Sequence, residues 1–213
     1  MSTVEKMTVH KALCELKVID SRINKAISGC TFVTANKHNN TKISGVPIAE
    51  ACEFIKSSYQ SAVDLIARRD AIKRAVVKSN AVTLVVIDGV EYTVAEAIEM
   101  KNHGMDHVLT LMKKLGSDLA IAKRAADSEN ALLDRRGDEY IRNMYNTTDM
   151  KNLAPEAAAE RKKFMESITV ELVDPLHVSD KIANLDRVYH NFMVEVDAAL
   201  STSNAVTMIE VAY

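Results

Sequence analysis

The strongest constraint in the sequence is the stretch 79–99, SNAVTLVVIDGVEYTVAEAIE. Two short runs rich in β-branched residues, 82–87 and 90–93, are separated by the pair Asp88-Gly89. An Asp-Gly pair between apolar runs is typical of a type I′ turn, because both central residues of that turn need a positive φ. The stretch therefore predicts a β-hairpin in which both turn residues have φ > 0.

A helix is expected on each side of this hairpin. The pair Ser79-Asn80 is typical of a helix end, and Thr93 lies three residues before Glu96. This is the spacing of a capping box, in which each side chain accepts a backbone N–H of the new helix. A two-stranded hairpin is only marginally stable alone, so it is expected to pack on other elements.

Composition favours long helices over an all-β fold. Apolar residues make up 47% of the 213 residues and aromatic residues 5%, with no Trp, 3 Pro and 6 Gly. Apolar residues at helical spacing predict helices at about 8–28, 47–78, 93–143, 155–166 and 178–200. Strands are expected at about 82–87, 90–93, 168–173 and 205–211. We expect one domain, residues 1–213, that is mainly α with a small β-sheet (α+β): long antiparallel helices with a hairpin and a C-terminal strand at one end.

The pentapeptide Ser-Asn-Ala-Val-Thr occurs twice, at 79–83 and at 203–207. Both copies follow a long amphipathic segment and precede an apolar, β-rich run. Identical residues in an equivalent context indicate equivalent turns, and a chance match is the alternative. We expect the strands at 82–87 and 206–211 to belong to one small mixed sheet.

The three cysteines, Cys14, Cys30 and Cys52, are odd in number and lack the Cys-x-x-Cys spacing of a metal or redox site. We expect reduced, buried thiols in a cytoplasmic protein. The opening segment, MSTVEKMTVHKALCELK, has no continuous apolar core and is not expected to be a signal peptide. No run approaches the roughly 18 uncharged apolar residues that span a membrane. The sequence thus predicts a soluble protein of the cytoplasm.

Three segments resemble a known protein family. They are ALCELKVIDSRINKAI, SNAVTLVVIDGVEYTVAEAIEMKN and ITVELVDPLHVSDKIANLDRVYHNFMVEVDAALSTSNAVTMIEV. Over more than half of the chain, by pattern more than by identity, they resemble the DIP1984-like family, some members of which are labelled septicolysin. The resemblance implies long helices, a small sheet and self-association, and it brings no reaction, catalytic residue or cofactor. The label implies a pore-forming toxin, which no membrane-seeking stretch of this sequence supports.

Charge is unevenly distributed along the chain. Residues 1–80 carry 13 Lys/Arg and 7 Asp/Glu, whereas residues 81–213 carry 14 and 22, for a net charge of −2. The second half of the second expected helix concentrates five cations: Arg68, Arg69, Lys73, Arg74 and Lys78. Arg grips phosphate or carboxylate bidentately, and Lys adds a point charge. We therefore take this basic cluster as a candidate anion site, and the alternatives are a solvated helix face or ion pairs between subunits.

A weaker, secondary candidate for ligand binding consists of Arg124, Arg135 and Arg136. His103 and His107 have the i, i+4 spacing that can hold zinc, but Gly104 stands where the metalloprotease signature has Glu. No phosphate-binding loop, dinucleotide fingerprint or serine-hydrolase motif occurs. We expect no metal, cofactor, nucleic acid, membrane partner or enzymatic activity.

Two functions are compatible with these features. The first is a non-enzymatic homo-oligomer that sequesters a small anionic, nucleotide-type ligand in basic pockets. The second is a structural or assembly scaffold built from coiled helices. Arginines of the second helix that converge on a concave pocket would favour sequestration, and arginines paired with carboxylates of a neighbour would favour the scaffold.

Overall fold

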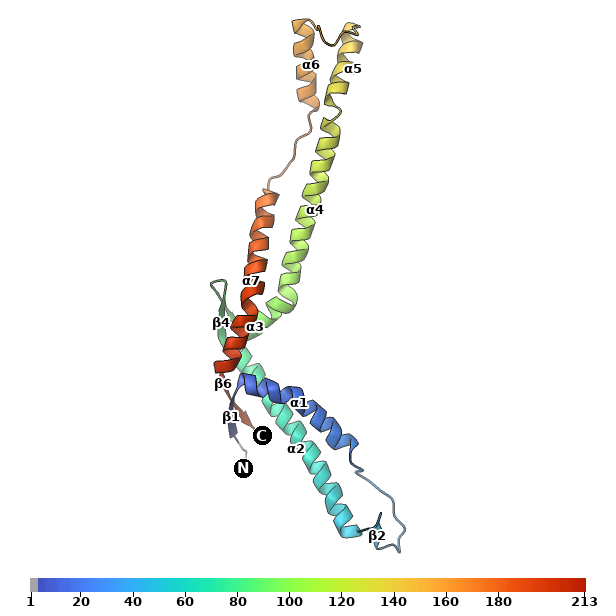
Figure 1. Ribbon diagram of the computed structural model, residues 1–213, viewed down its shortest axis with the longest axis vertical. Helices are drawn as coiled ribbons and strands as arrows, with labels where there is room; N and C mark the ends of the chain where they lie inside the picture. The colour runs from blue at the N-terminus through green and yellow to red at the C-terminus, as the bar shows by residue number, and fades with distance from the viewer. Residues whose placement is uncertain (1–3) are drawn as a thin grey trace. The chain divides into compact units, whose positions relative to one another are not determined.

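The computed structural model describes residues 4–213, which form two compact units. Unit 1 comprises Met1–His103 and Asn191–Tyr213, and unit 2 comprises Gly104–His190. The chain is mainly helical with three two-stranded antiparallel sheets, which confirms the expected class (Figure 1). Each unit is described by itself, and the expectation of one domain stays a prediction.

Unit 1 contains all the strands found in residues 4–213, together with the helical elements next to them. Its helical elements are α1 (Val9–Ser28), α2 (Ile48–Asn80), α3 (Val94–Glu99), the π-helical turn η1 (Met100–Gly104) and the second half of α7 (Val178–Val206). Its strands are β1 (Val4–Thr8), β2 (Lys42–Ile43), β3 (Val46–Pro47), β4 (Leu84–Ile87), β5 (Val90–Thr93) and β6 (Met208–Ala212). Unit 2 contains α4 (Met105–Asn130), α5 (Leu133–Tyr145), α6 (Pro155–Ile168) and the first half of α7.

The hairpin between β4 and β5 has the predicted turn. Asp88 and Gly89 have φ of 50° and 74°, so both residues lie in the left-handed region. Thr93 and Glu96 form the predicted capping box: the Glu96 N–H donates to Thr93 Oγ1 at 3.1 Å, and the Thr93 N–H donates to Glu96 Oε2 at 2.7 Å. The hairpin packs on α7, where Glu195 accepts the Asp88 N–H at 2.7 Å.

The expectation that both pentapeptides lead into one sheet is wrong. β4 pairs only with β5, and β6 pairs with β1 in a separate antiparallel sheet. Val4–Thr8, just before α1, forms a strand that the sequence analysis did not anticipate, and this strand provides β6 with its hydrogen-bonding partner. The C-terminal strand also begins later than expected, at Met208, because α7 continues to Val206.

The two pentapeptides nevertheless form the same turn. The Thr83 N–H donates to the Ser79 carbonyl at 2.9 Å, and the Thr207 N–H donates to the Ser203 carbonyl at the same distance. In each copy the serine and threonine hydroxyls also lie within hydrogen-bonding distance, at 3.3 and 3.5 Å. Both copies thus share this closing hydrogen bond before a strand begins, although α2 ends at Asn80 and α7 continues to Val206.

The equivalence extends to the paired strands and to the helices that follow them. The N–H of Val94, the first residue of α3, donates to the carbonyl of Thr83 at 2.9 Å. In the same way, the N–H of Val9, the first residue of α1, donates to the carbonyl of Thr207 at 2.9 Å. Each of these two helices has a threonine N-cap whose side chain accepts a backbone N–H. The unit α2–β4·β5–α3 therefore has a counterpart in α7–β6·β1–α1.

Each strand pair packs on the helix that leads into the other pair. The core around β1 and β6 contains Met7, Val9, Ala12, Ile72, Val76, Ile209 and Val211. The buried residues of the other half are Val85, Ile87, Val94, Ala97, Phe192 and Val196. Helix α2 leads into β4 but packs against β1 and β6, and α7 leads into β6 but packs against β4 and β5. The two halves are therefore related by an approximate two-fold arrangement. We call this part of unit 1, made of the four strands and the adjoining helix ends, the hub.

In unit 2, α5 and α6 pack closely. The rings of Tyr140 and Phe164 are stacked with centroids 4.1 Å apart. Gly137 lies buried inside α5, where an added Cβ atom would lie 2.9 Å from the sulfur of Met165. The glycine therefore permits a close helix–helix approach and does not break the helix.

The strand expected at 168–173 is absent. Helix α6 ends at Ile168. The N–H of Val170 donates to the side-chain oxygen of Asn130, and the side-chain nitrogen of Asn130 donates to the carbonyl of Val170, both at 2.9 Å. One amide side chain thus takes the place of a neighbouring strand. A tertiary contact of this kind has no local sequence signal.

Other boundaries and exposures also differ from the expectations. The third helix is divided into α3, η1, α4 and α5, and the turn before α5 falls at 131–132 with no glycine in it. The second helix begins at Ile48, because Pro47 pairs in β3 and precedes the helix. The cysteines are free, as expected, but the prediction of burial is wrong: Cys14 and Cys52 are exposed and Cys30 is half-buried.

The equivalence of the two halves predicts that the chain tolerates circular permutation in the hub. Val4 and Ala212 are paired at the open ends of β1 and β6, where the other half has the Asp88-Gly89 turn. A variant opened between Asp88 and Gly89, with a short Gly-Ser linker from Tyr213 to Met1, should fold. We expect its circular dichroism spectrum and cooperative unfolding to match those of the parent.

A permutant opened between Lys73 and Arg74 is the control, because this cut interrupts α2 beside the buried Ile72. It should lose cooperative unfolding. Equal loss of structure in both permutants would contradict the equivalence of the halves.

Candidate functional site

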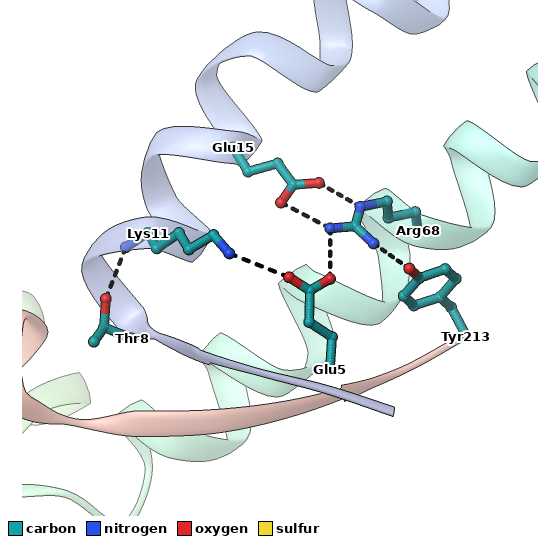
Figure 2. Close-up of polar contacts among 6 residues, drawn as sticks. All are labelled: Glu5, Thr8, Lys11, Glu15, Arg68 and Tyr213. Atoms are coloured by element: carbon teal, nitrogen blue, oxygen red, sulfur yellow. Dashed lines mark hydrogen bonds and ion pairs between the residues drawn. The ribbon is translucent and has the colours of Figure 1, made fainter. Parts of the chain in front are cut away.

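The side chain of Arg68, on α2, joins four segments of unit 1 (Figure 2). Its Nε and Nη2 donate to both carboxylate oxygens of Glu15 on α1, with Nη2 3.0 Å from Oε2. Nη2 also donates to Glu5 on β1 at 2.9 Å, and Nη1 donates to the hydroxyl of Tyr213, next to the end of β6. We call these four residues, Glu5, Glu15, Arg68 and Tyr213, the arginine latch.

Local structure places each member of the latch. Thr8 ends β1 and caps α1 by accepting the Lys11 N–H at 3.2 Å, which puts Glu5 before the helix and Glu15 two turns into it. Lys11 approaches Glu5 as well, at 3.2 Å. The cation of Arg68 also lies 4.8 Å from the centroid of the Tyr213 ring, a cation–π distance. Residues from both ends of the chain thus meet one guanidinium group.

The latch is strong for a site near the surface. The side chains of Arg68 and Glu15 are each 21% exposed, and their contact is bidentate, a geometry that adds both energy and direction. Hydrogen bonds from Arg68 lower the pKa of Glu15 and of Glu5 below 4.5. The same carboxylates raise the pKa of Arg68, with Glu15 as the main cause. Four of the five N–H groups of this guanidinium are occupied, so little of it is available to a ligand.

Arg69 is also paired with carboxylates of its own chain. Its Nε donates to Asp20 on α1 at 2.8 Å, and its Nη1 donates to Asp70 at 3.1 Å. Both hydrogen bonds raise the pKa of Arg69, and the one to Asp20 has the larger effect. The two arginines at the start of the basic cluster therefore connect α2 to α1.

The remaining three cations of the basic cluster behave differently. Within residues 4–213, Lys73, Arg74 and Lys78 form no ion pair. Lys73 lines a surface hollow of about 360 Å³ together with His10 and Lys17, whereas Lys78 lines a separate groove beside β6. The cluster is therefore divided and does not surround one pocket.

The secondary candidates belong to unit 2, and each has a partner nearby. Arg124 donates from Nε to the carbonyl of the preceding turn at 3.1 Å. Arg135 lies 3.6 Å from Glu139, and Arg136 lies 2.8 Å from Glu129. In the described part of the chain, no hydrogen bond or ion pair joins these three arginines to one another. They are occupied by local helix contacts.

Sequence reasoning did not identify the carboxylates of the latch. In the sequence, Glu5 and Glu15 are visible only as charges of the N-terminal half, and Tyr213 carries no signal. A weak signal was present, since Glu15 and Arg68 lie on two successive helices expected to be antiparallel. Which turns of the two helices meet is a tertiary property.

Comparisons with known proteins give no match to a protein-family model, a curated protein or a solved structure. No helix among residues 4–213 is both long and apolar enough to cross a membrane. Over the same residues, no group of three or more His, Cys, Asp or Glu side chains is placed to hold a metal ion. Functional inference for this chain therefore depends on the contacts and surfaces described above.

The latch predicts a difference between two neighbouring arginines. Arg68→Met should lower the free energy of unfolding by about 1–3 kcal/mol, because it leaves two partly buried carboxylates without their donor. Arg69→Met should lower it much less, because the ion pairs of Arg69 are with exposed carboxylates. Urea unfolding at pH 7 provides the measurement, and equal losses would contradict the structural role of Arg68.

Acid titration gives an internal control for this prediction. Folding lowers the pKa of Glu15, so the latch stabilises the folded state above pH 4.5, and this stabilisation is lost as the pH falls below that value. Glu15→Gln should therefore flatten the loss of stability between pH 5 and 3 relative to the parent. An unchanged profile would show that the ion pair does not stabilise the fold.

Proposed function

We propose that the protein is a cytoplasmic, non-enzymatic assembly scaffold that functions as a homo-oligomer. The observation that carries this proposal is the apolar face that α2 of unit 1 leaves exposed in the single chain.

The character of this surface supports self-association. The apolar stripe that the sequence predicts along α2 is exposed in the single chain at Ile48, Tyr59, Val63 and Ile66. Apolar residues repeated along one face of a helix usually mark an interface, because water contact with them is unfavourable. The resemblance to the DIP1984-like family, which we keep as part of the proposal, implies self-association as well.

The pairing of two arginines within the chain weakens the case for sequestration. Arg68 and Arg69, two of the five cations of the basic cluster, connect α2 to α1 within one chain. Ion pairs between helices make the α1–α2 hairpin stiffer, and a stiff arm is useful in an assembly. The proposal assigns no catalytic step to any residue.

The first test is the mass of the protein in solution. At micromolar concentration we expect a multiple of the 23.5 kDa chain mass, because the exposed apolar stripe of α2 is buried only between copies. Sedimentation velocity and light scattering after size exclusion measure this directly. A single species near 23.5 kDa over the whole concentration range would refute the scaffold.

Sequestration of a small anion remains a second candidate, favoured by the unpaired part of the basic cluster. In the described chain, Lys73 and Arg74 have no carboxylate partner, and the hollow beside Lys73 contains a second lysine, Lys17, and His10. Three nitrogen-bearing side chains around one hollow provide donors for phosphate oxygens. The ligand in this proposal is of nucleotide type, bound without turnover.

Calorimetry against a panel of nucleoside mono-, di- and triphosphates tests this candidate. If the hollow binds phosphate, Lys17→Gln together with Lys73→Gln should weaken binding at least tenfold, because both lysines line the hollow and each substitution removes one positive charge from it. The matched control is Lys113→Gln together with Lys123→Gln, which removes two exposed cations from α4. Absence of heat with every nucleotide would eliminate sequestration, and equal weakening by the control would show non-specific charge attraction.

A further inference from the structure

The hollow beside Lys73 brings together four polar side chains that the proposed scaffold does not use. His10, Cys14 and Lys17 lie on α1, and Lys73 lies on α2. The hollow has a volume of about 360 Å³. A nucleophile, a base and two cations, contributed by two helices, therefore border one surface hollow.

Local structure explains why these side chains meet. Cys14 is four residues after His10, and Lys17 is three residues after Cys14. Residues three and four apart are neighbours on a helix surface, so all three lie on one face of α1. The Arg69–Asp20 ion pair connects α2 to α1, and Lys73 follows Arg69 by one helical turn. Lys73 therefore reaches the same hollow from α2.

Cys14 and His10 have the geometry of a thiol and its proton acceptor. The Sγ atom of Cys14 lies 3.7 Å from Nε2 of His10, within hydrogen-bonding distance for a sulfur atom. When the imidazole carries its proton on Nδ1, Nε2 accepts the thiol hydrogen. The thiolate is the nucleophilic form of cysteine, and a base within hydrogen-bonding reach can generate it during reaction. Both side chains are exposed, so a reagent can reach the sulfur from water.

The two lysines determine which reagents the hollow favours. Within residues 4–213, neither Lys17 nor Lys73 forms an ion pair. The lining residues of the hollow include no carboxylate. A concave surface lined by cations raises the local concentration of anions, and an ammonium group donates charge-assisted hydrogen bonds to carboxylates. The hollow therefore selects small molecules that carry negative charge.

The other two cysteines lack this arrangement. In the part of the chain that the structure describes, Cys14 is the cysteine with a histidine at hydrogen-bonding distance. Cys30 lines a different pocket, to which Glu50 contributes a carboxylate that repels anions. Cys52 is exposed, but the ammonium group of Lys56, one turn further along α2, is paired with Glu53 at 2.8 Å. Cys52 is thus an internal control for exposure alone.

We propose that Cys14 is a modification site that forms a mixed disulfide with a small anionic disulfide, meaning a low-molecular-weight disulfide that carries carboxylates. His10 accepts the thiol proton, and the sulfur of Cys14 attacks one sulfur of the disulfide. A new S–S bond forms to Cys14 as the original S–S bond breaks, and the electron pair leaves on the second sulfur. This thiolate takes up the proton from His10.

The reaction is a stoichiometric and reversible exchange. Cys14 is oxidised, the small disulfide is reduced, and one molecule of small thiol is released per chain. An excess of thiol reverses the exchange, because the same thiolate chemistry then runs from the other side. This inference goes beyond the proposed scaffold and does not depend on self-association.

Two single-cysteine variants test the site. One keeps Cys14 (Cys30→Ser with Cys52→Ser), and the other keeps Cys52 (Cys14→Ser with Cys30→Ser). The probe is dithiobis(nitrobenzoate), an anionic aromatic disulfide whose released thiolate is measured by its absorbance. At neutral pH and low ionic strength, Cys14 should react about tenfold faster than Cys52, because the lysines concentrate the anion. Equal rates overturn the inference.

Charge selectivity separates recognition by the lysines from simple exposure. In the variant that keeps Cys14, Lys17→Gln with Lys73→Gln should slow the reaction with the anionic probe about tenfold. The reaction with dithiodipyridine, an uncharged disulfide, should be nearly unchanged. The matched control, Lys113→Gln with Lys123→Gln on α4, should keep both rates. Equal slowing of the two probes by the hollow variant overturns the selection of anions.

The variant His10→Gln tests the proton transfer. It should slow the reactions of Cys14 with both probes, because the thiol loses its proton acceptor whatever the charge of the disulfide. Unchanged rates with both probes overturn the role of His10.

A measurement on the unmodified protein covers the case in which a variant does not fold. One equivalent of oxidised glutathione, an anionic disulfide, followed by peptide mass mapping should label Cys14 before Cys30 and Cys52. Excess reduced glutathione should remove the label. First labelling at Cys30 or Cys52 overturns the inference. A monomeric mass in solution refutes the scaffold and leaves the labelling order unchanged, so the two proposals fail separately.

Discussion

The hub depends on burial of strand residues against helices of the opposite half. Ile72 on α2 and Val196 on α7 lie seven residues before the serine of each pentapeptide, and both are fully buried. Each helix therefore supports the strand pair formed after the other helix. Two-stranded sheets are marginal alone, and this reciprocal burial is what makes both of them stable. The helical elements of unit 1 begin or end at this core.

The two halves of the hub share a backbone arrangement but fill one position differently. Arg68 and Phe192 lie at equivalent distances before the two pentapeptides. Phe192 is buried and makes an edge-to-face contact with Tyr92, whereas Arg68 holds the carboxylates of the latch. An arginine in such a place requires partners, because an unpaired, partly buried charge is costly. This requirement explains why Arg68, the least exposed arginine of the basic cluster with an ion pair, is a structural residue of the hub.

Several features were predictable from sequence because they depend on neighbouring residues. The Asp88-Gly89 turn and the capping box of Thr93 and Glu96 involve groups at most three residues apart, and both formed as expected. The long helices followed from apolar spacing, which is also local. The repeated pentapeptide correctly indicated two equivalent turns. Of the candidate site, the sequence could show that cations concentrate on α2, but not which of them remain available.

Tertiary structure alone decided the partners. β6 pairs with β1 from the opposite end of the chain, and Asn130 takes the place of a strand beside Val170, 40 residues away. Glu15 and Arg68 are separated by 53 residues, so their ion pair depends on the register of α1 against α2. The physical reason is common to these cases. The sequence shows which hydrogen-bonding groups and charges need a partner, and of what kind. Only the folded chain determines which partner lies within hydrogen-bonding distance.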